Sequence, residues 1–203
     1  CVRLANQDFQ VKTALIDYRY LCGDEPLTRE FTTALEREII NKNADRFFQE
    51  KANESQERHR RYGDSIYILE PHLKEGQGGL RDLHTAGWLA KVKFKVRDLR
   101  ELIPKGVLAA AALKEVETAR DFLWRVRNTL HLFEHAEQDL LTFERQDALA
   151  PVLCFPNVPS FMREFYRHAT IISAFSEMLL ERCRPTSRFV SFLSRPGGRE
   201  IRN

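Results

Sequence analysis

The chain has 203 residues, enough for one domain of moderate size, and 43% of them are apolar, which supports a substantial core. The net charge of +3 is too small to indicate a nucleic-acid-binding protein. The four cysteines lie far apart with no C-x-x-C pair, and no apolar run approaches the roughly 18 residues of a membrane span, so we expect a cytoplasmic protein with no membrane partner.

The first recognisable pattern is the segment FQVKTALIDYRYLCGD, residues 9–24. Polar and apolar side chains alternate in residues 13–20, which predicts extended structure. Asp17 interrupts this apolar segment, and a carboxylate is costly to bury unless it is paired or bound to a metal. The simpler alternative is that Asp17 faces solvent or pairs with Arg19 or Arg3.

A helix is predicted from about Thr28, with a one-sided apolar set of Phe31, Leu35, Ile39 and Phe47. The polar stretch QEKANESQERHRRYGD, residues 49–64, follows and fits either a solvated helix or a mobile linker. Residues 65–71, SIYILEP, fit either a strand or a buried connection.

A glycine cluster, KEGQGGLRD at residues 74–82, follows this connection. Successive glycines allow backbone N–H groups to converge on an anion, and the start of a helix adds partial positive charge. Lys74 and Arg81 would supply formal charge, although the spacing is that of neither a Walker loop nor G-x-G-x-x-G. The alternative is a tight turn with a surface pair of Arg81 and Asp82.

Helical periodicity dominates the rest of the chain. The three apolar stripes are Leu80, Leu83, Gly87, Ala90 and Phe94; Ala119, Phe122, Leu123, Val126, Leu130 and Phe133; and Phe161, Phe165, Ala169, Ile172, Phe175 and Leu179. Three prolines in residues 148–160 predict a break between the last two stripes. The predicted fold is mainly α, a bundle of four to six helices with a short extended segment near the N-terminus.

The string HLFEH, residues 131–135, matches the H-x-x-E-H pattern of some zinc proteases. A zinc site also needs a third protein ligand. Because short motifs match by chance, we favour a pair of histidines at the boundary of an amphipathic helix.

Residues 68–91, ILEPHLKEGQGGLRDLHTAGWLAK, resemble the central region of the bacterial PII uridylyltransferase/uridylyl-removing enzymes. Their pattern is E-P-x-[LVI]-K-x-G-x-G-G-L-R-D-[LI]-[HQ]-x-x-x-W, and the chain matches all its fixed positions. The chain departs from the family at Gln77, where proline is expected between the first two glycines. Three further segments resemble the family in the same order, at residues 13–24, 122–146 and 161–169. Glutamine synthetase adenylyltransferases share part of the glycine string but generally continue with glutamate, where this chain has His84.

The resemblance implies a nucleotidyltransferase of the DNA-polymerase-β type that moves UMP from UTP to a tyrosine of the PII signal protein, with Mg²⁺ as the expected metal. The chain has no G-S pair and no D-x-D, the main signatures of that catalytic fold. The site residues implied are Asp17, as a catalytic and metal-binding carboxylate on a short strand, and the nucleotide-binding set Lys74, Gly78, Gly79, Arg81 and Asp82. Asp82 would fix Arg81 or cap the helix that begins beside it.

The resemblance also implies a division of the chain. Residues 1–24 would be the remnant of a nucleotidyltransferase domain, residues 25–185 a helical associated domain, and residues 186–203 a linker toward a further domain. The helical domain would wall the nucleotide site and help to dock PII, and the chain alone would be inactive. The alternatives are another nucleotidyltransferase of this type, such as an adenylyltransferase or a regulated relative, and a non-catalytic helical interaction module.

Overall fold

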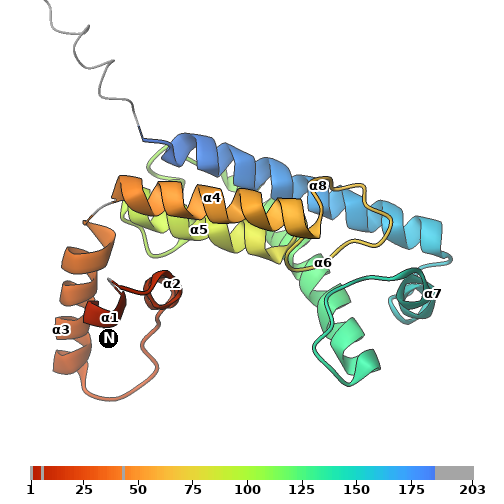
Figure 1. Cartoon of the computed structure of the whole chain (residues 1–203), viewed down its shortest axis with the longest axis horizontal. Coiled ribbons are helices and arrows are strands. Elements are labelled where there is room, and N and C mark those ends of the chain that lie inside the picture. Colours follow the sequence, from red (N-terminus) through yellow and green to blue (C-terminus); the bar gives the residue numbers. More distant parts are fainter. Residues whose placement is uncertain (1, 6, 43, 186–203) are drawn as a thin grey trace, which may run out of the picture.

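The structure is a computed structural model that describes residues 2–5, 7–42 and 44–185. It is mainly α-helical, which confirms the predicted fold class (Figure 1). In these residues no strand is present, and no helix is long and apolar enough to cross a membrane. The predicted linker at residues 186–203 lies outside the described residues.

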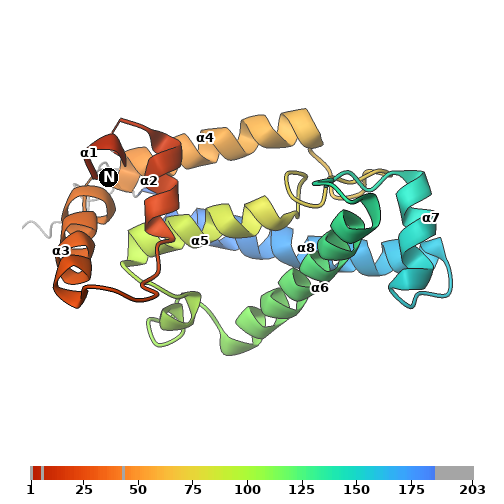
Figure 2. The same ribbon diagram turned by 90° about the horizontal axis from the view of Figure 1, so that it is seen from below.

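Four long helices form the main body of the fold. They are α4 (Ala44–Tyr62), α5 (Leu80–Phe94), α6 (Ala110–Glu134) and α8 (Val158–Cys183). Helices α4, α5 and α8 lie side by side with α5 in the middle, and α6 crosses α8 and contacts α5 (Figures 1 and 2). Because α5 is covered by α4 and α8, most of its side chains are buried.

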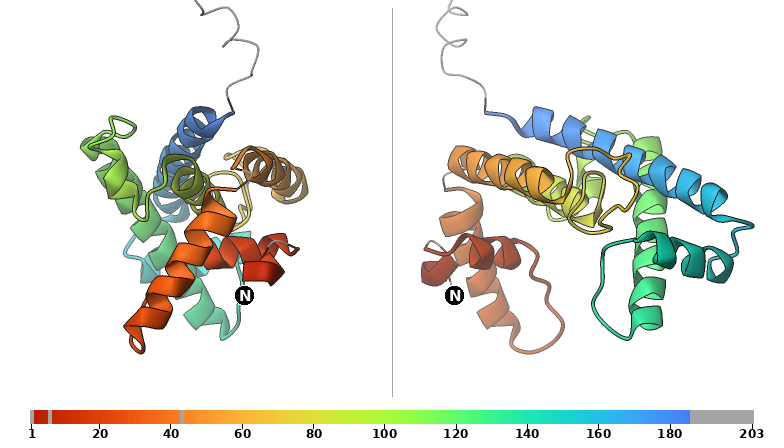
Figure 3. Two further views of the ribbon diagram at one scale, coloured as in Figure 1. Left: turned by 90° about the vertical axis from the view of Figure 1, so that its left-hand side faces the viewer. Right: turned by 45° about the vertical axis from the view of Figure 1, so that its right-hand side comes forward.

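The shorter elements gather at the two ends of this body (Figure 3). At one end lie α1 (Val2–Ala5), α2 (Phe9–Ile16), α3 (Glu25–Leu35) and the π-helical turn η1 (Glu36–Ile40). At the other end α7 (Phe143–Val152) packs on α6 and α8. The 3₁₀ helix η2 (Leu99–Leu102) contacts α5 and α6 and lies toward the first end. Only α3 to α8 have ten or more residues among the described helices, in agreement with the predicted four to six.

The predicted apolar stripes account for the core. All six stripe residues of α8 are buried, and so are those of α6 except Phe133, which lies exposed in the last turn of that helix. The predicted break is also present, because α7 ends at Val152 and α8 begins at Val158. Asn157 caps α8 by accepting a hydrogen bond from the N–H of Ser160 at 2.9 Å.

The predicted extended segment near the N-terminus is wrong, because its first half is the helix α2. Asp8 caps this helix by accepting hydrogen bonds from the N–H groups of Gln10 and Val11 at 2.8 and 3.0 Å. Thr13 and Ile16 are its buried residues. Their spacing of three follows the helical period, which the local alternation of polar and apolar residues had obscured.

The structure also shows how the next two segments, the helix predicted from about Thr28 and residues 49–71, fold. Helix α3 begins at Glu25, earlier than predicted, because Asp24 caps it and Pro26 fits its first turn. The polar stretch belongs to helix α4, and residues 65–71 form an irregular connection rather than a strand. This connection is held by hydrogen bonds to its carbonyl groups from Tyr166 and Gln146 at 3.0 and 2.8 Å.

Candidate functional site

The glycine cluster forms a tight turn pressed against α8. Gly78 has a φ of +74°, and a Cβ atom there would lie 2.4 Å from the carbonyl oxygen of Ala169. A Cβ atom on Gly79 would lie 2.8 Å from the carbonyl oxygens of Gly76 and Lys74. Backbone conformation and close approach therefore both require glycine at Gly78, whereas close approach alone requires it at Gly79.

The backbone N–H groups of the turn are already bonded within the protein. Gly78 donates to the Asp82 carboxylate at 2.8 Å, and Gly79 donates to the carbonyl of Gly76 at 3.0 Å. Leu80 and Arg81 donate to carbonyl groups of the same loop at 3.1 and 2.9 Å. The turn as it stands therefore presents side chains, rather than converging amides, to a ligand.

Asp82 is buried at the centre of a polar cluster that joins the turn to α4. Its carboxylate accepts from Arg58 at 2.6 Å, lies 2.8 Å from the His59 imidazole, and accepts from the Gly78 N–H. Burial would raise the pKa of Asp82, but the hydrogen bond from His59 and the charge of Arg58 outweigh it and hold that pKa below its usual value. Arg58 also donates to the Glu75 carbonyl at 2.8 Å, so it fixes the turn at a second point.

This arrangement corrects one prediction for Asp82. The carboxylate does not pair with Arg81, since Arg58 and His59 take that place. It accepts from the N–H of Gly78, the residue before the N-cap Gly79, and so ties the glycine turn to the first turn of α5.

Lys74 and Arg81 lie on the outer side of the same turn. Both approach the Glu75 carboxylate, Lys74 at 3.8 Å and Arg81 at 3.3 Å. The guanidinium carbon of Arg81 is 5.9 Å from the centre of the Trp88 ring. Arg58 also approaches the Glu75 carboxylate, at 3.9 Å, so three cations share it and excess positive charge remains beside an aromatic ring.

Asp17 was predicted to lie on a short strand, but it is the residue that ends α2. Its carboxylate accepts hydrogen bonds from the Trp88 indole and from the Lys91 ammonium, both on α5. Within the described ranges no three His, Cys, Asp or Glu side chains come together as a metal site.

The charged and aromatic groups of the candidate site lie along one face of α5. Arg81, His84, Trp88, Lys91 and Lys95 are spaced by three or four residues, which places them along one side of the helix. Asp17 is bonded to the middle of this face and Arg81 lies at its start. The predicted site residues of α2, the turn and α5 therefore lie along one surface, except for Asp82, which is buried beneath it.

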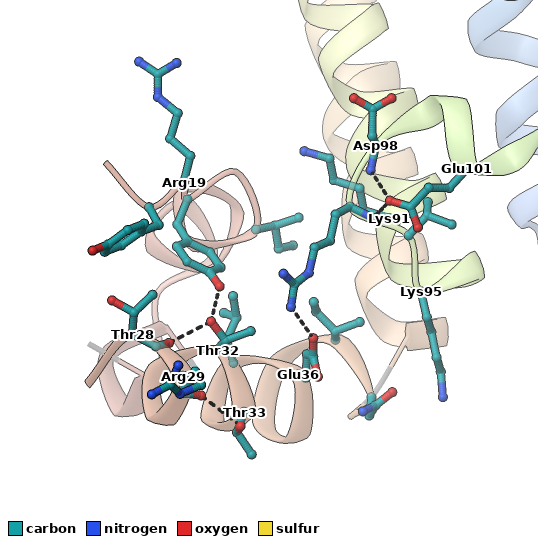
Figure 4. Close-up of a pocket in the computed structure, with 18 of the residues that line it drawn as sticks. Arg19, Thr28, Arg29, Thr32, Thr33, Glu36, Lys91, Lys95, Asp98 and Glu101 are labelled. Carbon is teal, nitrogen blue, oxygen red and sulfur yellow. Dashed lines mark hydrogen bonds and ion pairs between the residues drawn. The ribbon is translucent and has the colours of Figure 1, made fainter. Parts of the chain in front are cut away.

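A cleft of about 1050 Å³ opens beyond the far end of that face, between α5 and the group of α2, α3 and η1 (Figure 4). Lys91 and Lys95 border it on one side and Thr32 and Glu36 on the other. Both cations and carboxylates line it, and Arg97 is bonded to Glu36 at 3.1 Å. Lys74 and Arg81 do not line it.

The family described as GlnD PII-uridylyltransferase matches residues 46–180, about two thirds of the chain. A curated protein of Novosphingobium aromaticivorans, the bifunctional uridylyltransferase/uridylyl-removing enzyme, is 38% identical over 185 residues, covering 88% of this chain. The chain belongs to the GlnD PII-uridylyltransferase family.

The family match covers the glycine turn, α5 and α6, and nearly all of α4 and α8. It favours the uridylyltransferase interpretation over the adenylyltransferase one. Asp17 lies before the matched residues. The chain spans 20% of the length of the relative from Novosphingobium, so the activity named for that protein describes a much longer chain.

Sequence reasoning missed the buried polar residues of α4. Lys51, Ser55 and Arg58 are all buried, spaced by four and three residues along one side of that helix. The Lys51 ammonium lies 4.6 Å from the centre of the Trp88 ring, 4.9 Å from that of Phe9, and 2.6 Å from Glu54. No signal marks these three among the polar residues around them.

The histidines of HLFEH have structural surroundings. His131 lies 3.1 Å from Asp139, which is also bonded to Arg127 at 2.6 Å. His135 ends α6 in the left-handed conformation, with a φ of 52°. Their positions agree with the favoured interpretation as helix-boundary residues.

Proposed function

We propose that this chain is the helical part of a cytoplasmic enzyme that transfers UMP from UTP to a tyrosine of PII. The outer face of the glycine turn contributes to its nucleotide site. The observation that carries the proposal is the placement of Lys74 and Arg81 on the outer side of a turn held by Asp82 and Arg58. Cations fixed in advance bind a polyphosphate with little loss of side-chain freedom.

In this reaction the tyrosine oxygen attacks the α-phosphorus of UTP and loses its proton. The bond from that phosphorus to the bridging oxygen breaks, and pyrophosphate leaves with the added negative charge. Lys74 and Arg81 would neutralise that charge, and the bound cations would favour the leaving group. Gly78 and Gly79 shape the turn, and Asp82 keeps it in place.

Asp17 would supply one carboxylate near this face. It now accepts from Trp88 and Lys91, so it must exchange these partners before it can bind a metal. Mg²⁺ would provide charge neutralisation at the phosphates when bound. The role of the helices in docking PII rests on membership of the family.

Calorimetry with UTP and Mg²⁺ tests the proposal. Each charge-assisted contact contributes about 1.5–3 kcal/mol, so the double variant Lys74→Ala/Arg81→Ala should bind at least about tenfold more weakly than the unchanged chain. Lys93→Ala is the matched control, because it removes an exposed cation from the same helix outside this face. Equal binding by the unchanged chain and the double variant, or no heat from either, would contradict the proposal and favour a helical interaction module.

A further inference from the structure

A second, smaller cavity lies between α5, η2 and α6. Its volume is about 330 Å³. Leu83, Leu113 and Val116, all buried, line its base. Ion pairs surround its mouth, including Arg100 with Glu117 at 2.7 Å. An apolar base with polar groups at the mouth is the usual composition of a small-molecule site.

Gly87 lies in the middle of α5 and lines this cavity. It is buried, yet a Cβ atom added there would meet no atom within 4 Å. Glycine is an unfavourable residue in a helix interior, and neither a positive φ nor a close contact requires it here. Because glycine has no side chain, a volume remains beside α5 that the described residues do not fill.

Two aromatic rings form the wall beside Gly87. The His84 and Trp88 rings have their centres 5.8 Å apart and their planes 37° apart. The Trp88 indole is held by its hydrogen bond to Asp17, whereas the imidazole of His84 makes no hydrogen bond to the described residues. Burial, and then the charge of Arg81, lower the pKa of His84, so its neutral imidazole offers one donor and one acceptor.

We propose that this cavity binds the planar heteroaromatic base of a nucleotide, with His84 at the edge of the ring. The inference rests on the proposed function, because the same nucleotide would extend its phosphates to Arg81 and Lys74. Gly87 lies six residues after Arg81, about 9 Å along the helix, a separation that a ribose and phosphates can span. The base would fill the space in front of Gly87 and cover the apolar residues behind it.

The test uses the variants Gly87→Ala and Gly87→Leu, which fill the cavity by different amounts. Gly87→Ala should raise the melting temperature by about 2–4 °C, because alanine favours the helix and meets no neighbour. Each variant should nevertheless bind uridine more weakly, at least about tenfold for Gly87→Leu. If Gly87→Ala is more stable than the unchanged protein but binds uridine more weakly, the weaker binding results from loss of the site and not from loss of the fold. Lys93→Ala again serves as the control that should bind normally.

Binding is followed by NMR, with uridine and inorganic tripolyphosphate as separate probes. Uridine should shift the Gly87 amide and the Trp88 indole signals, and tripolyphosphate should shift those of Lys74 and Arg81 in the unchanged chain and in Gly87→Leu alike.

Three outcomes overturn the base site. They are uridine shifts that Gly87→Leu leaves unchanged, uridine shifts elsewhere in the protein, and no uridine shift at all. If tripolyphosphate still binds at Arg81 in any of these cases, the proposed function stands without the base site. If neither probe binds, both proposals fail.

Discussion

Two aspartates of this protein each pair with a cation on another helix, yet their surroundings differ. The side chains of Asp82 and Arg58 are 5% and 7% exposed, while those of Asp17 and Lys91 are 44% and 21% exposed. Asp82 also accepts from a backbone N–H and lies beside His59, so its bonding capacity is filled within the protein. Burial therefore makes the first pair a fixed support of the glycine turn, whereas the second pair remains accessible for exchange with a ligand.

The largest expected effect is that of removing the buried carboxylate. Asp82→Ala leaves Arg58 buried without its partner, and should lower the free energy of unfolding by about 3–5 kcal/mol. Urea unfolding followed by circular dichroism measures this. A loss below about 1 kcal/mol would show that Asp82 and Asp17 are energetically alike, and would remove the contrast between the two pairs.

Gly78→Ala tests the turn that the buried pair supports. The left-handed backbone and the approach to Ala169 should together lower the free energy of unfolding by about 1–3 kcal/mol. Gly106→Ala is the matched control, because Gly106 has a similar positive φ, 68°, but a Cβ atom there meets nothing within 4 Å. Equal losses in the two variants would mean that the contact with α8 adds nothing.

The pH dependence of stability should also identify the buried pair. The pKa of Asp82 is lowered in the folded state, so its ionised form stabilises the fold above the ordinary aspartate pKa of about 4. That contribution should be lost as the pH falls through the folded-state pKa. The stability difference between the unchanged protein and Asp82→Asn should therefore be constant near neutral pH and should shrink below about pH 4. A difference that does not change with pH in acid would contradict this assignment.

The smallest expected effect is that of Asp17→Ala. A partly exposed pair contributes little, so the free energy of unfolding should change by less than about 1 kcal/mol. Because the Trp88 indole loses its acceptor, its fluorescence should nevertheless change. A loss of stability as large as that of Asp82→Ala would show that Asp17 is a structural residue and is not available to a ligand.

Periodicity and glycine chemistry in the sequence predicted much of this fold. The stripes of α6 and α8 are long enough for their period to be read directly, and Gly78 and Gly79 marked a turn with special backbone needs. The helix α2 was missed because eight residues contain too few helical turns for a clear period. The partner of Asp82 was missed because Arg58 is 24 residues away, and local patterns do not report contacts at that separation.

The position of Lys51 has a consequence for the N-terminal helices. Its ammonium lies between Phe9 of α2 and Trp88 of α5, and burial lowers its pKa. If α2 moved away, water would reach this charge on the side that Phe9 now covers, and the indole of Trp88 would lose its bond to Asp17 in the same motion. Since the chain has only two tryptophans, the emission spectrum would report whether the N-terminal helices are seated or displaced.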